Sequence, residues 1–305
     1  MVKISIVISA FNEEKKIRGC LESASFADEI IFIDNSSTDK TGEIAKKYTK
    51  KVYTQKNDPA KIDLQKNFGI EKAAGDWIFV LDGDEEITPE LKKEIEHIIS
   101  PSTPLRTEPV NGFWIPRKNI IFDKWIQHSG WYPDYQLRLF RKGKGKYNKE
   151  HYHEPITVTG ETKQLTEHLL HHNFETIGQF LYKHLQVYAP NESEELLRKG
   201  YVFDYKDAIQ FPVKEFLSRY FAREGYKDGF HGLILALLMA IYHFVIFTYL
   251  WEKKKFADEG HSLESFKKEI QQAHKDMQFW QDKKVIDEEE NLMKRTALKI
   301  KNKLF

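Results

Sequence analysis

Asp82 and Asp84 flank a single glycine directly after the apolar run 77–81, and this tripeptide is the chain's clearest candidate for metal chemistry. The glycine lets the chain turn so that both carboxylates can face one ion. Carboxylate oxygens are hard ligands, which favours Mg²⁺ or Mn²⁺. The alternative is a polar turn that merely ends a strand. Because the apolar run 77–81 is typical of a buried strand, we predict a divalent metal site at its end.

Polar residues also end the two other strongly apolar runs in this half of the chain. Asn12 and Glu13 follow residues 4–10, and Asp34 follows residues 29–33. These runs are rich in β-branched residues and predict buried strands. Helical patterns lie between the strands, at about 15–25, 38–48 and 63–74. The alternation predicts an α/β domain with a mostly parallel sheet, whose ligands bind beyond the carboxyl ends of the strands.

Composition excludes several classes of protein. The 305 residues include 47 Lys+Arg and 46 Asp+Glu, and this near balance argues against a nucleic-acid partner. With 1 Cys, no intramolecular disulfide can form, which favours a reducing compartment. Residues 1–10 are too short for the apolar region of a signal peptide. No glycine-rich dinucleotide or P-loop motif occurs before residue 100, so bound phosphates would need a cation as their counter-charge.

Three blocks together carry a family resemblance. Residues 6–14 read IVISAFNEE, residues 33–39 read IDNSSTD, and residues 75–85 read GDWIFVLDGDE. In this order and spacing they resemble glycosyltransferase family 2. The resemblance implies a Rossmann-like GT-A fold, a nucleotide-diphospho-sugar donor (most often a UDP-sugar), a divalent metal (Mg²⁺ or Mn²⁺) and inversion at the anomeric carbon.

The resemblance also implies roles on the donor side. Ala10, Phe11 and Glu13 would line the nucleoside pocket, and Asp34 would bond the base. Lys66 matches a position where the family often has arginine near the nucleotide. The alternative for Lys66 is a solvated helix face.

For the metal, the resemblance implies three ligand candidates. Asp84 would ligate the ion, and Asp82 would reach the ribose or the metal. His171 matches a position where a neutral imidazole could complete the coordination. The alternative for His171 is an ordinary hydrogen-bonded surface histidine near a strand end.

Residues 130–141 (GWYPDYQLRLFR) and 151–155 (HYHEP) resemble the acceptor side of bacterial lipopolysaccharide core glucosyltransferases. This resemblance implies transfer of a hexose, glucose in that subgroup, to a lipid-linked saccharide such as the lipopolysaccharide inner core. The same fold could instead act on a polyprenyl phosphate or a protein, or be a catalytically silent nucleotide-sugar-binding scaffold.

An inverting transfer needs a carboxylate that removes the acceptor's hydroxyl proton. Glu154 is the preferred candidate and Asp134 the second. Alternatively, Glu154 pairs with Arg138 or Arg141, and Asp134 holds an acceptor hydroxyl or caps a turn.

We expect a catalytic domain at residues 1–174, with a nucleotide-sugar half (1–100) and an acceptor half (101–174). A helical region follows at residues 175–305. Its segment 232–251 contains no Asp, Glu, Lys or Arg and is just long enough to span a bilayer. A spanning helix, an interfacial helix and a buried core helix all remain open.

Residues 294–305 form a basic amphipathic tail, which suits an anionic inner leaflet. The tail favours peripheral or shallow insertion at the cytoplasmic face of the inner membrane, where a lipid-linked acceptor would also lie. The alternative for the tail is a solvated helix that closes a homodimer.

Overall fold

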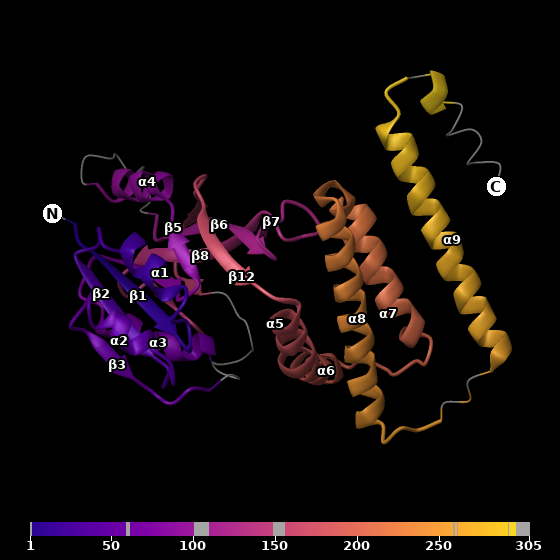
Figure 1. The fold of residues 1–305 in the computed structure, drawn as a ribbon, viewed down its shortest axis with the longest axis horizontal. Coiled ribbons are helices and arrows are strands. Elements are labelled where there is room, and N and C mark those ends of the chain that lie inside the picture. The colour runs from indigo at the N-terminus through magenta and orange to yellow at the C-terminus, as the bar shows by residue number, and fades with distance from the viewer. Residues whose placement is uncertain are drawn as a thin grey trace. The chain divides into compact units, whose positions relative to one another are not determined.

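The computed structural model describes residues 2–58, 62–100, 110–148, 156–258, 260, 262–291 and 293–296. The chain divides into two compact units, shown with their elements in Figure 1. The first, which we call the sheet unit, comprises Met1–Trp125 and Tyr132–Asn173. The second, the helical unit, comprises Ile126–Trp131 and Phe174–Phe305.

The sheet unit begins with alternating strands and helices. These are β1 (Ile4–Ala10), α1 (Ile17–Ser23), β2 (Glu29–Asp34), α2 (Thr41–Ala45), β3 (Val52–Thr54), α3 (Ile62–Lys72), β4 (Trp77–Asp82), β5 (Glu85–Ile87) and α4 (Pro89–Ile99). Strands then dominate: β6 (Gly112–Ile121), β7 (Lys124–Trp125), β8 (Asp134–Arg141), β9 (Gly145–Lys146), β10 (Thr157–Val158), β11 (Thr162–Gln164) and β12 (Leu169–Phe174).

The main sheet has the strand order β3-β2-β1-β4-β8-β6-β12-β5, with β7 and β11 also paired to β6. Strands β3, β2, β1 and β4 are parallel, whereas β8 pairs antiparallel with both β4 and β6. This mixed sheet with helical crossovers confirms the α/β prediction. Because β1, β2 and β4 run parallel, their carboxyl ends meet at one edge of the sheet.

Two apolar clusters cover the faces of this sheet. Alternate residues of β1 explain the division, because successive side chains of a strand point to opposite faces. Ile6 and Ile8 belong to the cluster that includes Leu21 of α1, and Val7 belongs to the cluster that includes Ile70 of α3. A strand buried on both faces is apolar throughout, which is why β1 reads as a continuous run rather than an alternating one.

The helical unit consists of α5 (Ile177–Leu181), a π-helical segment (Tyr182–Tyr188), α6 (Ala189–Arg198), α7 (Asp207–Leu217), a second π-helical segment (Ser218–Ala222), a 3₁₀ turn (Gly225–Asp228), α8 (Phe230–Lys253) and α9 (Leu263–Glu288). Segment Ile126–Trp131 joins this unit, where the buried carboxylate of Asp228 accepts hydrogen bonds from the backbone N–H groups of Gln127 and His128. The most apolar 18-residue window of helix α8 has a mean hydropathy of 2.3, so by length and composition alone the helix could cross a membrane.

His184 lies inside the aromatic core of the helical unit. Its ring stacks on Phe180 with centroids 3.9 Å apart, and it makes an edge contact with Tyr242. Its Nδ1 lies 2.9 Å from the carbonyl oxygen of Phe180. Burial penalises the charged imidazolium and lowers the pKa of His184 to about 4.

We predict that this histidine makes the helical unit less stable in mild acid. An unfolded histidine has a pKa of about 6.5, so the unfolded chain binds a proton that the folded chain excludes. The contribution of about 3 kcal/mol is fully present above pH ~6.5 and is lost as pH falls toward ~4. Denaturant titrations from pH 7 to pH 4 should show a flatter pH dependence for His184→Phe. The exposed His274→Phe control should keep the wild-type slope.

Candidate active site

The acidic strand ends lie side by side at the edge that the parallel strands share. In the sheet register, Asp82 at the end of β4 pairs with Ser9, and Asp34 at the end of β2 pairs with Ala10. The Asp82-to-Asp84 turn packs tightly on β1, because a Cβ at Gly83 would lie 2.7 Å from the Cβ of Ala10. Glycine is therefore required at position 83, because the turn passes so close to Ala10. The expected convergence of three acidic strand ends on one edge of the sheet is observed.

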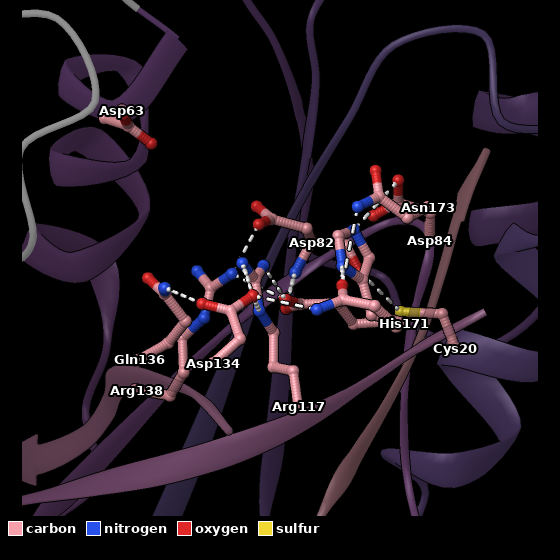
Figure 2. Close-up of polar contacts among 12 residues, drawn as sticks. Cys20, Asp63, Asp82, Asp84, Arg117, Asp134, Gln136, Arg138, His171 and Asn173 are labelled. Carbon is pink, nitrogen blue, oxygen red and sulfur yellow. Dashed lines mark hydrogen bonds and ion pairs between the residues drawn. The ribbon is translucent and has the colours of Figure 1, made fainter. Parts of the chain in front are cut away.

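Both oxygens of Asp82 are bound by cations. Its Oδ1 lies 2.6 Å from Lys66 Nζ. Its Oδ2 accepts a hydrogen bond of 2.5 Å from an Nη of Arg138 (Figure 2). Burial alone would raise the pKa of Asp82, but Arg138 and Lys66 hold it well below its ordinary value. Asp82 is therefore a permanent anion, already neutralised by protein groups.

Glu85 is a fully buried carboxylate one residue beyond the turn. Its Oε1 accepts hydrogen bonds from Arg138 at 2.6 Å and from Arg117 at 2.9 Å. Its Oε2 accepts the backbone N–H of Asp82 at 2.9 Å, which fixes the start of the turn. The Nε of Arg138 is buried and has no hydrogen-bond partner in the part of the chain that the structure describes. The pair of arginines thus holds the turn rigidly and leaves one donor for a further acceptor.

Asp134 is held by four donors from three side chains. Its Oδ2 accepts from Arg117 Nε at 2.9 Å, from an Nη of the same arginine at 2.5 Å, and from Asn119 Nδ2 at 3.1 Å. Its Oδ1 accepts from Gln136 at 2.9 Å. Burial would raise the pKa of Asp134, but Arg117 and the amide donors lower it below its ordinary value. A carboxylate held in this way is a weak base.

The amide of Asn119 links Asp134 to His171. Because ionised Asp134 can only accept, Asn119 must turn its Nδ2 toward it and its Oδ1 toward His171. His171 Nδ1 lies 2.7 Å from this oxygen and therefore carries the proton. The other ring nitrogen, Nε2, faces Asp84, whose Oδ2 lies 3.6 Å away. Figure 2 shows this relay beside the Asp82 network.

The structure distinguishes between the open alternatives for two predicted residues. Lys66 is 4% exposed and also lies 3.1 Å from Asp63, so it does not belong to a solvated helix face. His171 is 8% exposed in β12, where it pairs with Glu85 of β5, so it is not an ordinary surface histidine. His171 reaches the turn through the pairing of β12 with β5, and Lys66 reaches it from helix α3.

The remaining predicted residues lie at or near the same edge, with one exception. Phe11 is 37% exposed after β1, and the backbone N–H of Glu13 donates to Thr41 Oγ1 at 2.8 Å. Asp34 Oδ1 accepts the backbone N–H of Ser37 at 2.9 Å. Glu154 lies outside the described residues.

Sequence reasoning did not identify Arg117 and Asn119. Both lie on β6, where Arg117 pairs with Asp134 of β8 in the antiparallel register. An arginine and an asparagine two residues apart in a strand share one face, but this local signal is common and names no partner. Among the described residues, no group of three or more His, Cys, Asp and Glu side chains could hold a metal ion by protein ligands alone.

A cluster of acidic and basic side chains at the carboxyl ends of parallel strands lies where α/β enzymes bind their ligands. The family model described as glycosyl transferase family 2 matches residues 5–156. The chain belongs to this family and is a glycosyltransferase, and the expectation of a GT-A fold is confirmed.

Bacterial glycosyltransferases are among the proteins similar to this chain. A lipopolysaccharide core biosynthesis glycosyltransferase, LpsC of Rhizobium meliloti, is 24% identical over 82% of this chain and 92% of its own length. An uncharacterised glycosyltransferase of Rickettsia typhi is 26% identical over 80% of this chain and 85% of its own. Residues 1–349 of Staphylococcus aureus TarS, solved with UDP-GlcNAc, align with a TM-score of 0.41 at 16% identity, covering 86% and 94% of the two chains.

Proposed function

We propose that this enzyme transfers a hexose, glucose by subgroup resemblance, from a UDP-sugar to a lipid-linked saccharide such as the lipopolysaccharide inner core. The observation that carries the proposal is the cluster of Asp82, Asp84, Lys66 and Arg138 at the shared strand edge of a family 2 domain. The similarity to LpsC, which extends over most of both chains, supports the class of acceptor.

On the donor side, we assign the nucleoside to Ala10, Phe11, Glu13 and Asp34 at the shared strand edge. Ala10 and Asp34 lie opposite each other in the β1–β2 register, and Phe11 offers an exposed ring beside them. Lys66 and Arg138 bring two positive charges to the edge, and Arg138 Nε retains a buried donor that suits an anionic ligand. The carboxylate of Asp82 orients both cations.

The chemistry of the Asp84 and His171 side chains fits a divalent metal. A hard carboxylate oxygen and an imidazole nitrogen lie 3.6 Å apart, and the hydrogen bond of Nδ1 to Asn119 leaves Nε2 as the nitrogen that would ligate an ion. Two protein ligands leave positions for phosphate oxygens, as is usual for Mg²⁺. When bound, the ion would supply positive charge to the departing diphosphate. Asp82 is nearby, but Lys66 and Arg138 already bind both of its oxygens.

Asn119→Leu should weaken metal binding without removing a ligand. Without the Oδ1 acceptor, the tautomer and orientation of His171 are no longer fixed, and such outer contacts are typically worth about tenfold to a hundredfold in metal affinity. Titration calorimetry with Mn²⁺ measures this directly. Asn173→Ala is the matched control, because Asn173 contacts the same oxygen at a longer 3.4 Å and should change the affinity by less than about threefold. Equal affinities for wild type and Asn119→Leu would refute the relay.

We assign the general base to Glu154 rather than to Asp134. The acceptor hydroxyl must lose its proton to a carboxylate whose pKa is not lowered by bound cations. Arg117, Asn119 and Gln136 occupy the oxygens of Asp134 and lower its pKa, so this residue positions its neighbours instead.

A lipid-linked acceptor places the enzyme at the cytoplasmic face of the inner membrane, where nucleotide sugars are made. We therefore propose a peripheral or shallowly inserted enzyme. The basic residues Lys294 and Arg295 begin the proposed membrane-facing tail, and residues 297–305 lie outside the described chain.

The experiment that tests the proposal is a donor screen with membrane lipid extract as acceptor, followed by mass analysis of the product. A hexose added to a lipopolysaccharide precursor supports the proposal. Transfer to a polyprenyl phosphate or to a protein instead would replace the acceptor. Loss of turnover in chelator, restored by Mg²⁺ or Mn²⁺, would support the metal.

A further inference from the structure

Helix α8 is apolar around its whole circumference, yet only half of it is covered within the helical unit. Leu235, Met239, Ile246 and Leu250 are among the side chains that face the unit and are buried. On the other side, large apolar side chains with exposed fractions between 39% and 73% recur at helical spacing: Phe230, Leu237, Ile241, Phe244 and Trp251. We call these five residues the α8 stripe. A helix that is apolar on all sides belongs in a core or a membrane, and here half of it is left uncovered.

The packing of the covered half argues against a membrane-spanning α8. Near its middle, the hydroxyl of Tyr242 donates to Glu192 of α6, and His243 Nε2 lies 3.5 Å from Glu215 of α7. Both neighbouring helices carry carboxylates against the midpoint of α8. A transmembrane orientation would take these ionisable groups to the centre of the hydrocarbon layer, which strongly disfavours them. The same packing leaves the α8 stripe free to contact lipid if the helix lies parallel to the membrane plane.

The C-terminal end of α8 presents aromatic and basic side chains together. The rings of Trp251 and Phe256 meet edge to face with centroids 5.1 Å apart, and Phe256 is 59% exposed. Lys254 and Lys255 are exposed beside them, and neither has an ion pair recorded among the described residues. Exposed aromatic rings next to lysines suit the headgroup region of an anionic bilayer.

We propose that the α8 stripe, together with the lysines at its end, is a docking surface for an anionic lipid bilayer, on which α8 lies in the membrane plane. The lysines would contact the headgroups, and the apolar side chains would enter the adjoining acyl layer. This inference deepens the proposed function, since a lipid-linked acceptor is presented at that same surface.

Vesicle co-sedimentation without donor or acceptor tests the apolar part of this surface. Wild type should bind vesicles of equimolar phosphatidylcholine and phosphatidylglycerol more tightly than vesicles of phosphatidylcholine alone. The variant L237Q/I241Q/F244Q should bind the mixed vesicles at least about tenfold more weakly, because three exposed apolar side chains that would enter the acyl layer are replaced by polar ones. Phe279→Gln is the control, since it removes a 60% exposed ring from α9, and its binding should stay within about twofold of wild type. Circular dichroism melts verify that each variant is folded.

The charged part is tested by K254A/K255A, which should lose about tenfold in affinity for the mixed vesicles and little for the neutral ones.

Three outcomes would overturn the proposal. The stripe variant could bind vesicles as wild type does. The native protein could resist alkaline carbonate extraction from membranes, as a spanning protein does. The stripe variant could turn a dimer into a monomer with vesicle binding unchanged, which would identify a second copy of the chain as the partner. Asp84→Ala should keep full vesicle binding, so failure of the catalytic proposal can be told apart from failure of this one.

Discussion

Asp84→Ala should reduce both sugar transfer and donor hydrolysis at least about hundredfold while the protein stays folded. Asp84 is the carboxylate of the turn that lies beside an imidazole, with Oδ2 3.6 Å from His171 Nε2. Removing it takes away the hard oxygen that a divalent ion requires, and with the ion the charge that stabilises the departing diphosphate. The measurement is kcat/KM with saturating Mg²⁺ or Mn²⁺, beside a thermal melt.

Glu86→Ala is the matched control for this variant. Glu86 lies two residues further along, is about one-third exposed, and pairs with His172 at 3.3 Å. Losing this partly exposed pair should cost less than about threefold in kcat/KM. If Asp84→Ala retained near wild-type turnover, or if both variants lost activity equally, the assignment of Asp84 as a metal ligand would be wrong.

Arg138→Met should destabilise the sheet unit by up to about 3–5 kcal/mol, because Glu85 and Asp82 each lose one of their two cationic partners in a buried network. Arg138 is 4% exposed and donates to both Asp82 and Glu85, of which Glu85 is fully buried. Methionine fills much of the same volume, so the loss reports charge and hydrogen bonding rather than a cavity. Urea denaturation followed by tryptophan fluorescence measures the change.

Lys92→Met provides the comparison for an exposed cation in the same unit. Lys92 pairs with Glu96 at 3.9 Å on the surface of α4, and such pairs contribute less than about 0.5 kcal/mol. A second test combines Arg138→Met with Glu85→Gln. The double variant should be less destabilised than the sum of the single ones, because neutral glutamine no longer needs the arginine. A loss below about 1 kcal/mol for Arg138→Met alone would show that the network is not structural.

The sequence predicted the part of the site whose signals are local. Buried β-branched runs identify β1, β2 and β4, and an acidic residue at the end of each is visible without knowing the fold. The alternation with helices then implies parallel pairing, which is enough to bring Asp34 and Asp82 to one edge. The family resemblance of the three blocks agrees with the matched family domain.

The side chains that contact Asp134 and the Asp82-to-Asp84 turn from distant strands could not be predicted from local sequence patterns. Arg117 and Asn119 reach Asp134 through the β6–β8 register, and His171 reaches the turn through the β12–β5 register. Each pairing joins segments far apart in the chain, and a shift of one residue would turn the side chains to the other face of the sheet. The register of these strand pairs is therefore known only from the folded structure.

Helix α8 shows the same limit in a different form. Hydropathy sums over all faces of a helix, so the sequence of this segment left spanning, interfacial and buried helices open. The fold shows that one half packs against helices with carboxylates while the other half stays exposed.

The amino-acid order by itself determined the α/β class, the glycosyltransferase family and the acidic strand ends, because periodicity and short motifs are properties of neighbouring residues. Only the tertiary structure decided which cations bind Asp82, which groups the two ring nitrogens of His171 face and which side of α8 stays exposed. Those outcomes depend on which distant segments come into contact and how deeply each group is buried.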